Sequence, residues 1–450
     1  NMLLSSQQEL VVERFKNGEN LFISGPGGSG KTTLIKRLVE STDKNIQVCA
    51  LTGCAAILLQ SNAKTIHSWS GIKLAKGDLD KIVKNVVTNK YKSKDWKKTQ
   101  ILIVDEISMM SKRIFDLLNR IGKAVKKNQN PFGNMQVIFV GDFYQLPPIN
   151  GQDEDSDKFC FESDEWFKTF PKENHVILTN IYRQTDKQYT DILMMIRSGT
   201  INDDLFKILE KRLLSNLKKS DYNNCTPIKL YPVRSMVDKI NMQKFSELDD
   251  SKEFKQQLVV KTDCTEYIEA KIPIHSSKLR ECKKALPQQI DYEIQYLKNN
   301  SPLESELKMR IGSSVMCVVN LDMENNICNG SQGVITDIIT SDNGETRPIV
   351  TFTNGIVKQL SIHYIQSELY PNIMIGQYPL IMAWALTIHK IQGSTLETAE
   401  IDVGNNIFEY GQTYVALSRV KSLDGLYLNS IDIRKIKANP KVVNFYNCLK

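Results

Sequence analysis

The 450 residues are 41% hydrophobic and 24% charged, which is typical of a globular protein, and the length predicts two or three domains. No apolar segment reaches membrane-spanning length and the N-terminus lacks a signal-peptide core, so we expect an intracellular protein without a membrane partner. The nine cysteines include no C-x-x-C pair and the five histidines form no cluster, so we expect reduced thiols and no structural zinc. The net charge of +7 permits a nucleic-acid partner without requiring one.

The first informative motif is GPGGSGKT, residues 25–32, which matches G-x-x-x-x-G-K-[ST]. It follows a predicted buried strand over residues 20–24, and apolar residues at helical spacing follow it over 34–39, so phosphates would bind at a helix N-terminus. In such a loop Lys31 reaches the β and γ phosphates and Thr32 offers its hydroxyl to Mg²⁺. The residues of this loop predicted to bind the nucleotide are Gly25, Gly27, Gly28, Ser29, Gly30, Lys31, Thr32 and Thr33. A chance match in a chain of this length has odds of roughly 2%.

A second apolar run, residues 101–104, ends in two adjacent carboxylates, Asp105 and Glu106. Its composition is that of a strand buried on both faces. Asp105 can hold Mg²⁺ through water, and Glu106 can take a proton from the attacking water. An apolar run that ends in Asp-Glu is usually an ordinary surface turn. This one follows a P-loop in the sequence, with room for one βα unit between the two motifs, so it predicts a catalytic pair. The expected cofactors are therefore ATP and Mg²⁺.

The pattern of strands and helices predicts an α/β fold with two RecA-like, doubly wound parallel-sheet lobes. The expected strands of the first lobe cover residues 21–24, 46–51, 101–104, 136–140 and 176–178. The expected domains are a first lobe over 1–195, with a small wedge-like insertion near 64–100, a second lobe over 196–250 and 365–450, and an inserted accessory domain over 251–364. Short β-branched runs between 312 and 362 predict a small β-barrel in that insertion.

The first lobe also contains a basic run over residues 81–98, with seven lysines against one aspartate. A solvated helix and loop is at least as good an interpretation of this run as a DNA-contacting surface. The preceding residues 71–77 are a candidate for the element that parts a duplex.

The motif GDFYQLPP, residues 141–148, follows the predicted strand over 136–140. Gln145 would lie at the tip of a strand next to the P-loop, where it can sense the γ-phosphate or orient water. The rings of Phe143 and Tyr144 can stack on a nucleobase, but aromatic side chains beside a buried strand usually pack in the core. The sequence leaves both interpretations open.

Two motifs near the C-terminus, residues 383–395 and 411–420, contribute polar residues at the ends of helices. Taken in order, all of these motifs resemble those of the PIF-type (petite integration frequency) DNA helicases of superfamily 1. The resemblance extends from Leu4 to about Leu426. Its most specific segment is 113–136, which resembles the one that separates this family from its RecD-type relatives.

The resemblance departs from the family pattern at Asn134 and Met135, where the family more often has glycine and an aliphatic residue. The roles that it implies fall into three groups. Gln8 would read the adenine, and Gly393 would join the nucleotide-binding residues. The catalytic residues would be Lys31, Asp105, Glu106 and Gln145, together with two arginine fingers, Arg183 and Arg419. The residues similar to the family's strand-contacting positions are Thr52, Gly53, Thr65, His67, Phe143, Thr387, His389 and Lys390.

The function implied by the resemblance is a monomeric, ATP-dependent helicase that moves 5′ to 3′ on single-stranded DNA and unwinds duplexes and forks. One alternative is a DNA-binding P-loop switch that loads or remodels a partner without unwinding. Such switches commonly take their arginine finger from a neighbouring subunit, whereas this chain contains both candidates. The other alternative is a RecD-type recombination helicase, which the segment 113–136 disfavours.

Overall fold

The computed structural model describes residues 3–52, 55–56, 59, 62–218, 227–263, 285–367, 370–391 and 393–450. The chain forms two compact units, one of Asn1–Val233 with Thr387–Lys450 and the other of Arg234–Leu386. The second unit is wider at both ends than the predicted insertion, 251–364, and the proposed boundaries of the two lobes stay predictions. Among the described residues, no helix is both long and apolar enough to cross a membrane.

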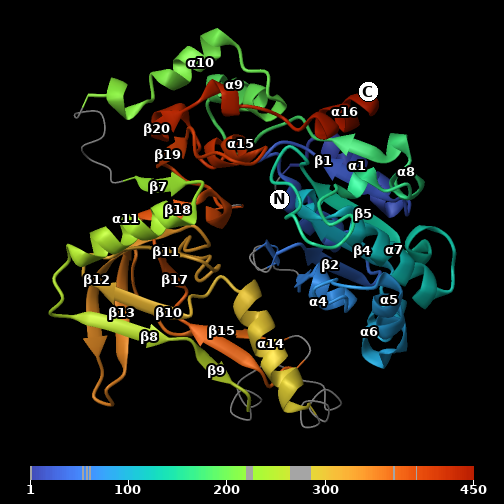
Figure 1. Cartoon of the computed structure of the whole chain (residues 1–450), viewed down its shortest axis with the longest axis horizontal. Coiled ribbons are helices and arrows are strands. Elements are labelled where there is room, and N and C mark those ends of the chain that lie inside the picture. Colours follow the sequence, from blue (N-terminus) through green and yellow to red (C-terminus); the bar gives the residue numbers. More distant parts are fainter. Residues whose placement is uncertain are drawn as a thin grey trace. The chain divides into compact units, whose positions relative to one another are not determined.

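The first unit contains a six-stranded parallel sheet (Figure 1), as predicted. Its strands are β1 (Leu21–Ser24), β2 (Ile46–Ala50), β3 (Lys64–Thr65), β4 (Ile101–Asp105), β5 (Gln136–Gly141) and β6 (His175–Ile177), in the order β3-β2-β4-β5-β1-β6. Every residue of β1, β4 and β5 is buried, because helices cover both faces of a parallel sheet. The carboxyl ends of these three strands therefore meet at one edge.

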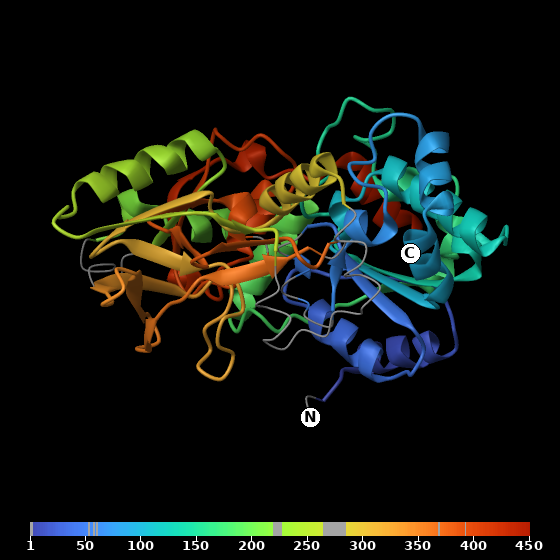
Figure 2. The same ribbon diagram turned by 90° about the horizontal axis from the view of Figure 1, so that it is seen from below.

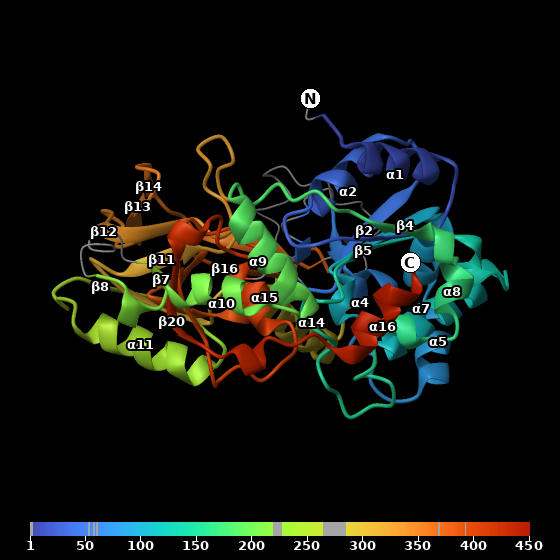
Figure 3. The same cartoon turned by 90° about the horizontal axis from the view of Figure 1, so that it is seen from above.

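Alternate residues of each strand enter two different cores. Leu21 and Ile23 pack with α1 (Ser6–Lys16) and α2 (Lys31–Glu40), whereas Phe22 points to the opposite face. The helices that contribute to the opposite core are α4 (Ile66–Ser70), α5 (Leu79–Thr88), α6 (Lys90–Lys98), α7 (Lys112–Lys126), α8 (Trp166–Thr169) and α16 (Pro440–Cys448). The C-terminal helix α16 thus lies among the elements of the first sheet, near α8 (Figure 1 and Figure 3).

A second sheet of the first unit has the order β18-β7-β19-β20. Its strands are β7 (Ile228–Tyr231), β18 (Ala385–Thr387), β19 (Ala399–Val403) and β20 (Leu426–Ile431). Strand β19 pairs in parallel with both β7 and β20, as expected for a second α/β lobe. The helices beside it are α9 (Lys187–Ser198), α10 (Asp203–Glu210) and α15 (Gln412–Leu417). Tyr189 of α9 donates a hydrogen bond of 2.5 Å to the carbonyl of Leu417, which joins α9 to α15.

The second unit contains a five-stranded antiparallel sheet in the order β14-β13-β12-β11-β17, in yellow to red in Figure 2. Its helices are α11 (Arg234–Ser246) and α14 (Pro287–Asn300), and its strands are β8 (Glu253–Gln257), β9 (Val259–Lys261), β10 (Glu306–Arg310), β11 (Ser314–Cys317), β12 (Gln332–Thr340), β13 (Thr346–Phe352), β14 (Val357–Gln359), β15 (His363–Gln366), β16 (Met374–Gln377) and β17 (Leu380–Met382). The antiparallel region is where the sequence predicts it, and its closure into a barrel stays a prediction.

Short 3₁₀ helices complete the chain: η1 (Ile107–Met109), η2 (Pro131–Asn134), η3 (Cys160–Glu162), η4 (Lys172–Asn174), η5 (Leu214–Asn216), η7 (Ile388–Ile391), η8 (Leu423–Gly425) and η9 (Ile433–Lys435). In η2, Phe132, Gly133 and Asn134 have φ of +53°, +66° and +66°. Asparagine is one of the few residues that adopt this left-handed conformation readily, so Asn134 fits a turn where the family more often has glycine. A Cβ on Gly133 would collide with the carbonyl oxygen of Gly122 in α7.

We expect Gly133→Ala to lower the free energy of unfolding by about 2 kcal/mol or more, because it adds a backbone collision to an unfavourable φ. Gly344→Ala is the matched control, since Gly344 has φ of +80° but no atom within 4 Å of an added Cβ. The control should cost about 1 kcal/mol. Urea unfolding of both variants measures the difference, and equal losses would contradict the tight contact between η2 and α7.

Candidate nucleotide site

The glycine loop between β1 and α2 has the geometry expected of a phosphate site. Gly28 and Gly30 have φ of +80° and +82°, and α2 begins at Lys31 with its free N–H groups at the loop. A Cβ on Gly28 would collide with the Cβ of Arg183, and one on Gly27 would lie 3.4 Å from Nη1 of Arg183. Glycine is therefore required here both for the backbone conformation and for the close approach of Arg183.

The predicted phosphate ligand Lys31 lies within this loop. Its Nζ donates hydrogen bonds of 2.8 and 2.9 Å to the carbonyls of Gly25 and Pro26. Burial lowers the pKa of Lys31, while the negative charges of Asp142, Glu106 and Asp105 act in the opposite direction. Lys31 is thus a half-buried cation near the acidic residues at the ends of β4 and β5.

The two predicted catalytic carboxylates lie at the carboxyl end of β4. The Oδ1 atom of Asp105 accepts a hydrogen bond of 2.8 Å from the backbone N–H of Glu106, whose φ is +57°. Burial, and then the charge of Glu106, raise the pKa of Asp105 to about 7. A divalent cation favours the charged carboxylate, and the oxygens of Asp105 and Thr32 are ligands that Mg²⁺ prefers. The donor set therefore fits the predicted metal.

Both predicted arginine fingers lie at the glycine loop. Arg419, which follows α15, is 2% exposed, and its Nη2 lies 3.6 Å from the position of a Cβ on Gly27. Its guanidinium donates hydrogen bonds to the carbonyl of Val415 (3.1 Å) and to Oγ of Ser418 (3.3 Å). Burial and the positive charge of Arg183 lower the pKa of Arg419 to about 9, and burial also lowers the pKa of Arg183. Two like charges at one loop, one of them buried and the other half-buried, are unfavourable together, so this position favours an anion.

Of the two predicted glutamines, Gln8 lies close to the glycine loop and Gln145 lies after β5, beside the start of α15. Gln8 caps α1, accepting a hydrogen bond of 3.0 Å from the N–H of Ser5, and its Nε2 lies 3.0 Å from the position of a Cβ on Gly30. Gln145 follows β5 and is 6% exposed. A Cβ on Gly411, the residue before α15, would lie 2.7 Å from the carbonyl oxygen of Gln145, so α15 begins against the loop after β5.

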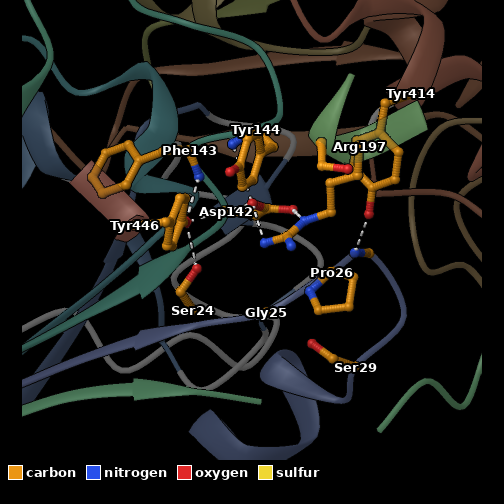
Figure 4. Close-up of polar contacts among 12 residues, drawn as sticks. Ser24, Gly25, Pro26, Ser29, Asp142, Phe143, Tyr144, Arg197, Tyr414 and Tyr446 are labelled. Carbon is orange, nitrogen blue, oxygen red and sulfur yellow. Dashed lines mark hydrogen bonds and ion pairs between the residues drawn. The ribbon is translucent and has the colours of Figure 1, made fainter. Parts of the chain in front are cut away.

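Sequence reasoning missed several polar residues of the site (Figure 4). The hydroxyl of Tyr414 accepts a hydrogen bond of 2.8 Å from the N–H of Gly27, and burial raises the pKa of Tyr414 to about 12. Asp142 forms an ion pair of 2.8 Å with Arg197 of α9. Tyr414 and Asp142 lie inside motifs that the sequence already singles out. Arg197, by contrast, has no local signal, nor has Tyr446 of α16.

The first group of predicted strand-contacting residues follows the carboxyl ends of β2 and β3. Thr52 lies two residues after the end of β2, and Thr65 ends β3, where its hydroxyl accepts a backbone hydrogen bond as the N-cap of α4. Burial lowers the pKa of His67 to about 4, so its imidazole is neutral at pH 7. Gly53 lies outside the described residues.

The second group lies at β18 and η7. Thr387 ends β18, and its Oγ1 accepts a hydrogen bond of 3.4 Å from the N–H of Lys390. His389 is exposed, and its ring lies 6.4 Å from that of Phe408 with an angle of 19° between their planes. Gly393 has φ of +85° in the following turn, and its part in nucleotide binding stays a prediction.

The ring of Phe143 belongs to the core. It is 1% exposed and lies 5.4 Å from the rings of both Phe22 and Phe445. Tyr144 is also in contact, since its ring stacks on that of Tyr446 at 4.9 Å. Of the two interpretations that the sequence leaves open for Phe143, packing in the core fits its position in the structure.

The predicted wedge, residues 71–77, contacts α7, one of the helices that cover the first sheet. The guanidinium of Arg113 donates a hydrogen bond of 2.9 Å to the carbonyl of Ala75, and Ile72 is buried, whereas Leu74 is 55% exposed. Most lysines of the basic run over 81–98 are exposed on α5 and α6. The role of this region in parting a duplex stays a prediction.

The fold and the site together define a P-loop protein of the RecA-like α/β class in which Arg183, after β6, and Arg419, after α15 beside the second sheet, lie at the glycine loop. Residues 3–205 match the family model described as PIF1-like helicase, and residues 294–338 match that of the DNA helicase Pif1 2B domain. The chain is 31% identical over 454 residues to the ATP-dependent DNA helicase Pif1 of Bdellovibrio bacteriovorus, covering 98% of this chain and 91% of that protein. The chain belongs to the PIF1-like helicase family.

Other relatives agree with this placement. The chain is 30% identical to the ATP-dependent DNA helicase PIF1 of Xenopus laevis, covering 99% of this chain but 64% of that protein. The structure is similar to that of Pif1 helicase from Candida albicans, with a TM-score of 0.77, 29% identity and 100% of both chains covered. It is also similar to Pif1 helicase from Bacteroides in complex with ADP-AlF3 and ssDNA, with a TM-score of 0.64, 27% identity and 100% and 97% of the two chains covered.

Two substitutions of Phe143 separate packing from base stacking. Phe143→Leu keeps most of the buried volume, so single-stranded DNA should bind within about twofold of the unsubstituted chain, whereas Phe143→Ala should lower the free energy of unfolding by about 3–5 kcal/mol. Fluorescence anisotropy with a labelled oligonucleotide and urea unfolding measure the two quantities. Loss of a stacked base would weaken binding of the leucine variant by about 1–3 kcal/mol, which would restore the stacking role.

Proposed function

We propose that this chain is an ATP-dependent DNA helicase that moves 5′ to 3′ on single-stranded DNA and unwinds duplex DNA. The observation that carries the proposal is the convergence of Arg183, which is half-buried, and Arg419, which is buried, on the glycine loop, although the charge of Arg183 disfavours that of Arg419. A triphosphate is the anion that would offset this repulsion at a P-loop. Membership of a helicase family supports the same conclusion.

The residues of the site divide the work of hydrolysis. Lys31 and the N-terminus of α2 would hold the phosphates, and Thr32 and Asp105 would hold Mg²⁺, which neutralises charge on the phosphate oxygens. Glu106 would accept a proton from the attacking water as general base. Arg183 and Arg419 would stabilise the charge that develops on the γ-phosphoryl group.

Hydrolysis would be coupled to movement because the site combines elements of two sheets. The glycine loop follows β1, whereas Arg419 follows α15 beside the second sheet. Nucleotide binding and release would therefore change how firmly the two sheets are held together. If Thr65 and His67 grip the strand from one side and His389 from the other, alternating grip gives directional stepping. The complex of the Bacteroides relative with ADP-AlF3 and ssDNA supports this assignment of ligands.

The catalytic unit would be a single chain, because both arginines reach the glycine loop of their own chain. Replacing either Arg183 or Arg419 by Ala should reduce ATP turnover by about 10³-fold with little loss of DNA binding. Arg434→Ala is the matched control, since Arg434 is 80% exposed and pairs with Asp432 away from the loop. A coupled phosphate-release assay measures turnover. An equimolar mixture of the two inactive variants should recover nothing, and recovery would show arginines supplied by a second chain.

The direction of movement is tested by matched duplexes with a 5′ or a 3′ single-stranded tail. With ATP and Mg²⁺, the 5′-tailed duplex should be opened and the 3′-tailed and blunt duplexes should not. The ATP site does not dictate this direction, because the same closing step drives either polarity, depending on which side holds the strand more tightly in each nucleotide state. Fluorescence-monitored unwinding gives the answer. A preference for the 3′ tail would contradict the proposed polarity, and no opening of either duplex would favour an ATP-driven switch.

A further inference from the structure

The C-terminal helix α16 is packed into the core of the first sheet, although about 260 residues separate it from β6. Phe445 stacks on Phe161 at 4.3 Å and Tyr446 stacks on Tyr144 at 4.9 Å. Both side chains are buried, with exposed fractions of 5% and 8%. None of the motifs discussed above includes this helix.

The hydroxyl of Tyr446 joins two strands at the edge where the nucleotide site lies (Figure 4). It forms a hydrogen bond of 2.6 Å with Oγ of Ser24, the last residue of β1 before the glycine loop. It also accepts a hydrogen bond of 3.1 Å from the N–H of Phe143, after β5, and lies 3.5 Å from Oδ1 of Asp142. One hydroxyl thus fixes the start of the glycine loop relative to the loop that follows β5.

Asp142 continues this connection to the helices of the second sheet. Its carboxylate is 1% exposed and accepts two hydrogen bonds of 2.8 Å from Nε and Nη2 of Arg197, a bidentate pair. The guanidinium of Arg197 also lies over the ring of Tyr144, 4.6 Å from its centre. Arg197 belongs to α9, the helix that begins shortly after Arg183 and that Tyr189 joins to α15.

We propose that Tyr446 is a positioning residue for ATP hydrolysis. Its hydroxyl orients the carboxylate of Asp142 toward Arg197 and so holds α9, which is joined to α15, in place relative to the glycine loop. Arg183 and Arg419, which lie beside these two helices, are thereby held at the loop. This inference rests on the proposed function. It predicts a loss of turnover with little change in the affinity for ATP, because the glycine loop and Lys31 hold the phosphates directly.

The decisive variant is Tyr446→Phe, which removes the hydroxyl and keeps the ring that stacks on Tyr144. We expect kcat of DNA-stimulated ATP hydrolysis to fall about 10-fold, the effect of one lost hydrogen bond in a buried network, with KM for ATP within about twofold of the unsubstituted chain. Arg197→Lys should have the same signature, because lysine cannot form the bidentate pair. The double variant should lose less than the product of the two effects, since both act on the carboxylate of Asp142.

The matched control is Phe445→Leu, on the same helix, which changes the packing and leaves the hydroxyl in place. It should lower the melting temperature while kcat stays within about twofold. All variants are assayed well below their melting temperatures, and Arg197→Lys gives an independent readout if Tyr446→Phe melts too early. An unsubstituted chain that neither hydrolyses ATP nor opens a 5′-tailed duplex refutes the proposed function. An active chain whose Tyr446→Phe variant keeps its kcat, or whose Phe445→Leu variant loses as much, overturns the role of Tyr446.

Discussion

The approach of two guanidinium groups to the glycine loop is the constraint on which the rest of the site depends. Arg419 is buried and Arg183 is half-buried there, and burial together with repulsion by the positive charge of Arg183 lowers the pKa of Arg419 to about 9. Backbone carbonyls of α15 and the charge of Glu106 offset part of this repulsion. An anion bound between them and the loop would offset the remainder. The unfavourable interaction thus lies at the position where the proposed function requires phosphate.

The ion pair Asp142–Arg197 differs from the two arginines, because its charges are opposite. Asp142 and Arg197 neutralise each other through two hydrogen bonds in a buried, aromatic environment. Removing one partner of such a pair leaves an uncompensated buried charge, so the pair is retained whether or not a ligand is bound. The site thus combines an ion pair, Asp142–Arg197, whose charges already balance, with two arginines, Arg183 and Arg419, whose charges a bound nucleotide would balance.

The parts of the structure that could be predicted from the sequence are those determined by residues close together in the chain. The strand ends over residues 101–105 and 136–141 agree within one residue with expectation, because strands buried on both faces are continuous apolar runs. The glycine loop and the carboxylates of Asp105 and Glu106 are local motifs with a chemical reason. Phe143 is different, because an aromatic residue after a buried strand packs or stacks according to what covers it. Here the element that covers Phe143 is α16, some 300 residues further along the chain. No residue near Phe143 in the sequence indicates this contact.

The boundaries of the second unit could not be predicted from the sequence for the same reason. Strands β16 and β17 lie beyond residue 364, yet they pair with β9 and β11 and so belong to the antiparallel unit. Antiparallel partners can be far apart in the chain, and the periodicity of a short strand does not reveal which partner it takes. Arg197 and Tyr446 also lack a sequence signal, since a lone arginine or tyrosine on an amphipathic helix is most often an ordinary surface or core residue.

The charges of the site, added together, indicate which ligand it suits. Among the described side chains that influence one another here, Lys31, Arg183, Arg197 and Arg419 are cationic, and Asp105, Glu106 and Asp142 are acidic. Because Arg197 takes up the charge of Asp142, the positive charges are in excess. An ATP–Mg²⁺ complex carries a net charge of about −2 at neutral pH, which suits this excess. The pair Asp142–Arg197 leaves Lys31 available to the phosphates, which is why the residues that orient this pair belong to the chemistry of the site as well as to its fold.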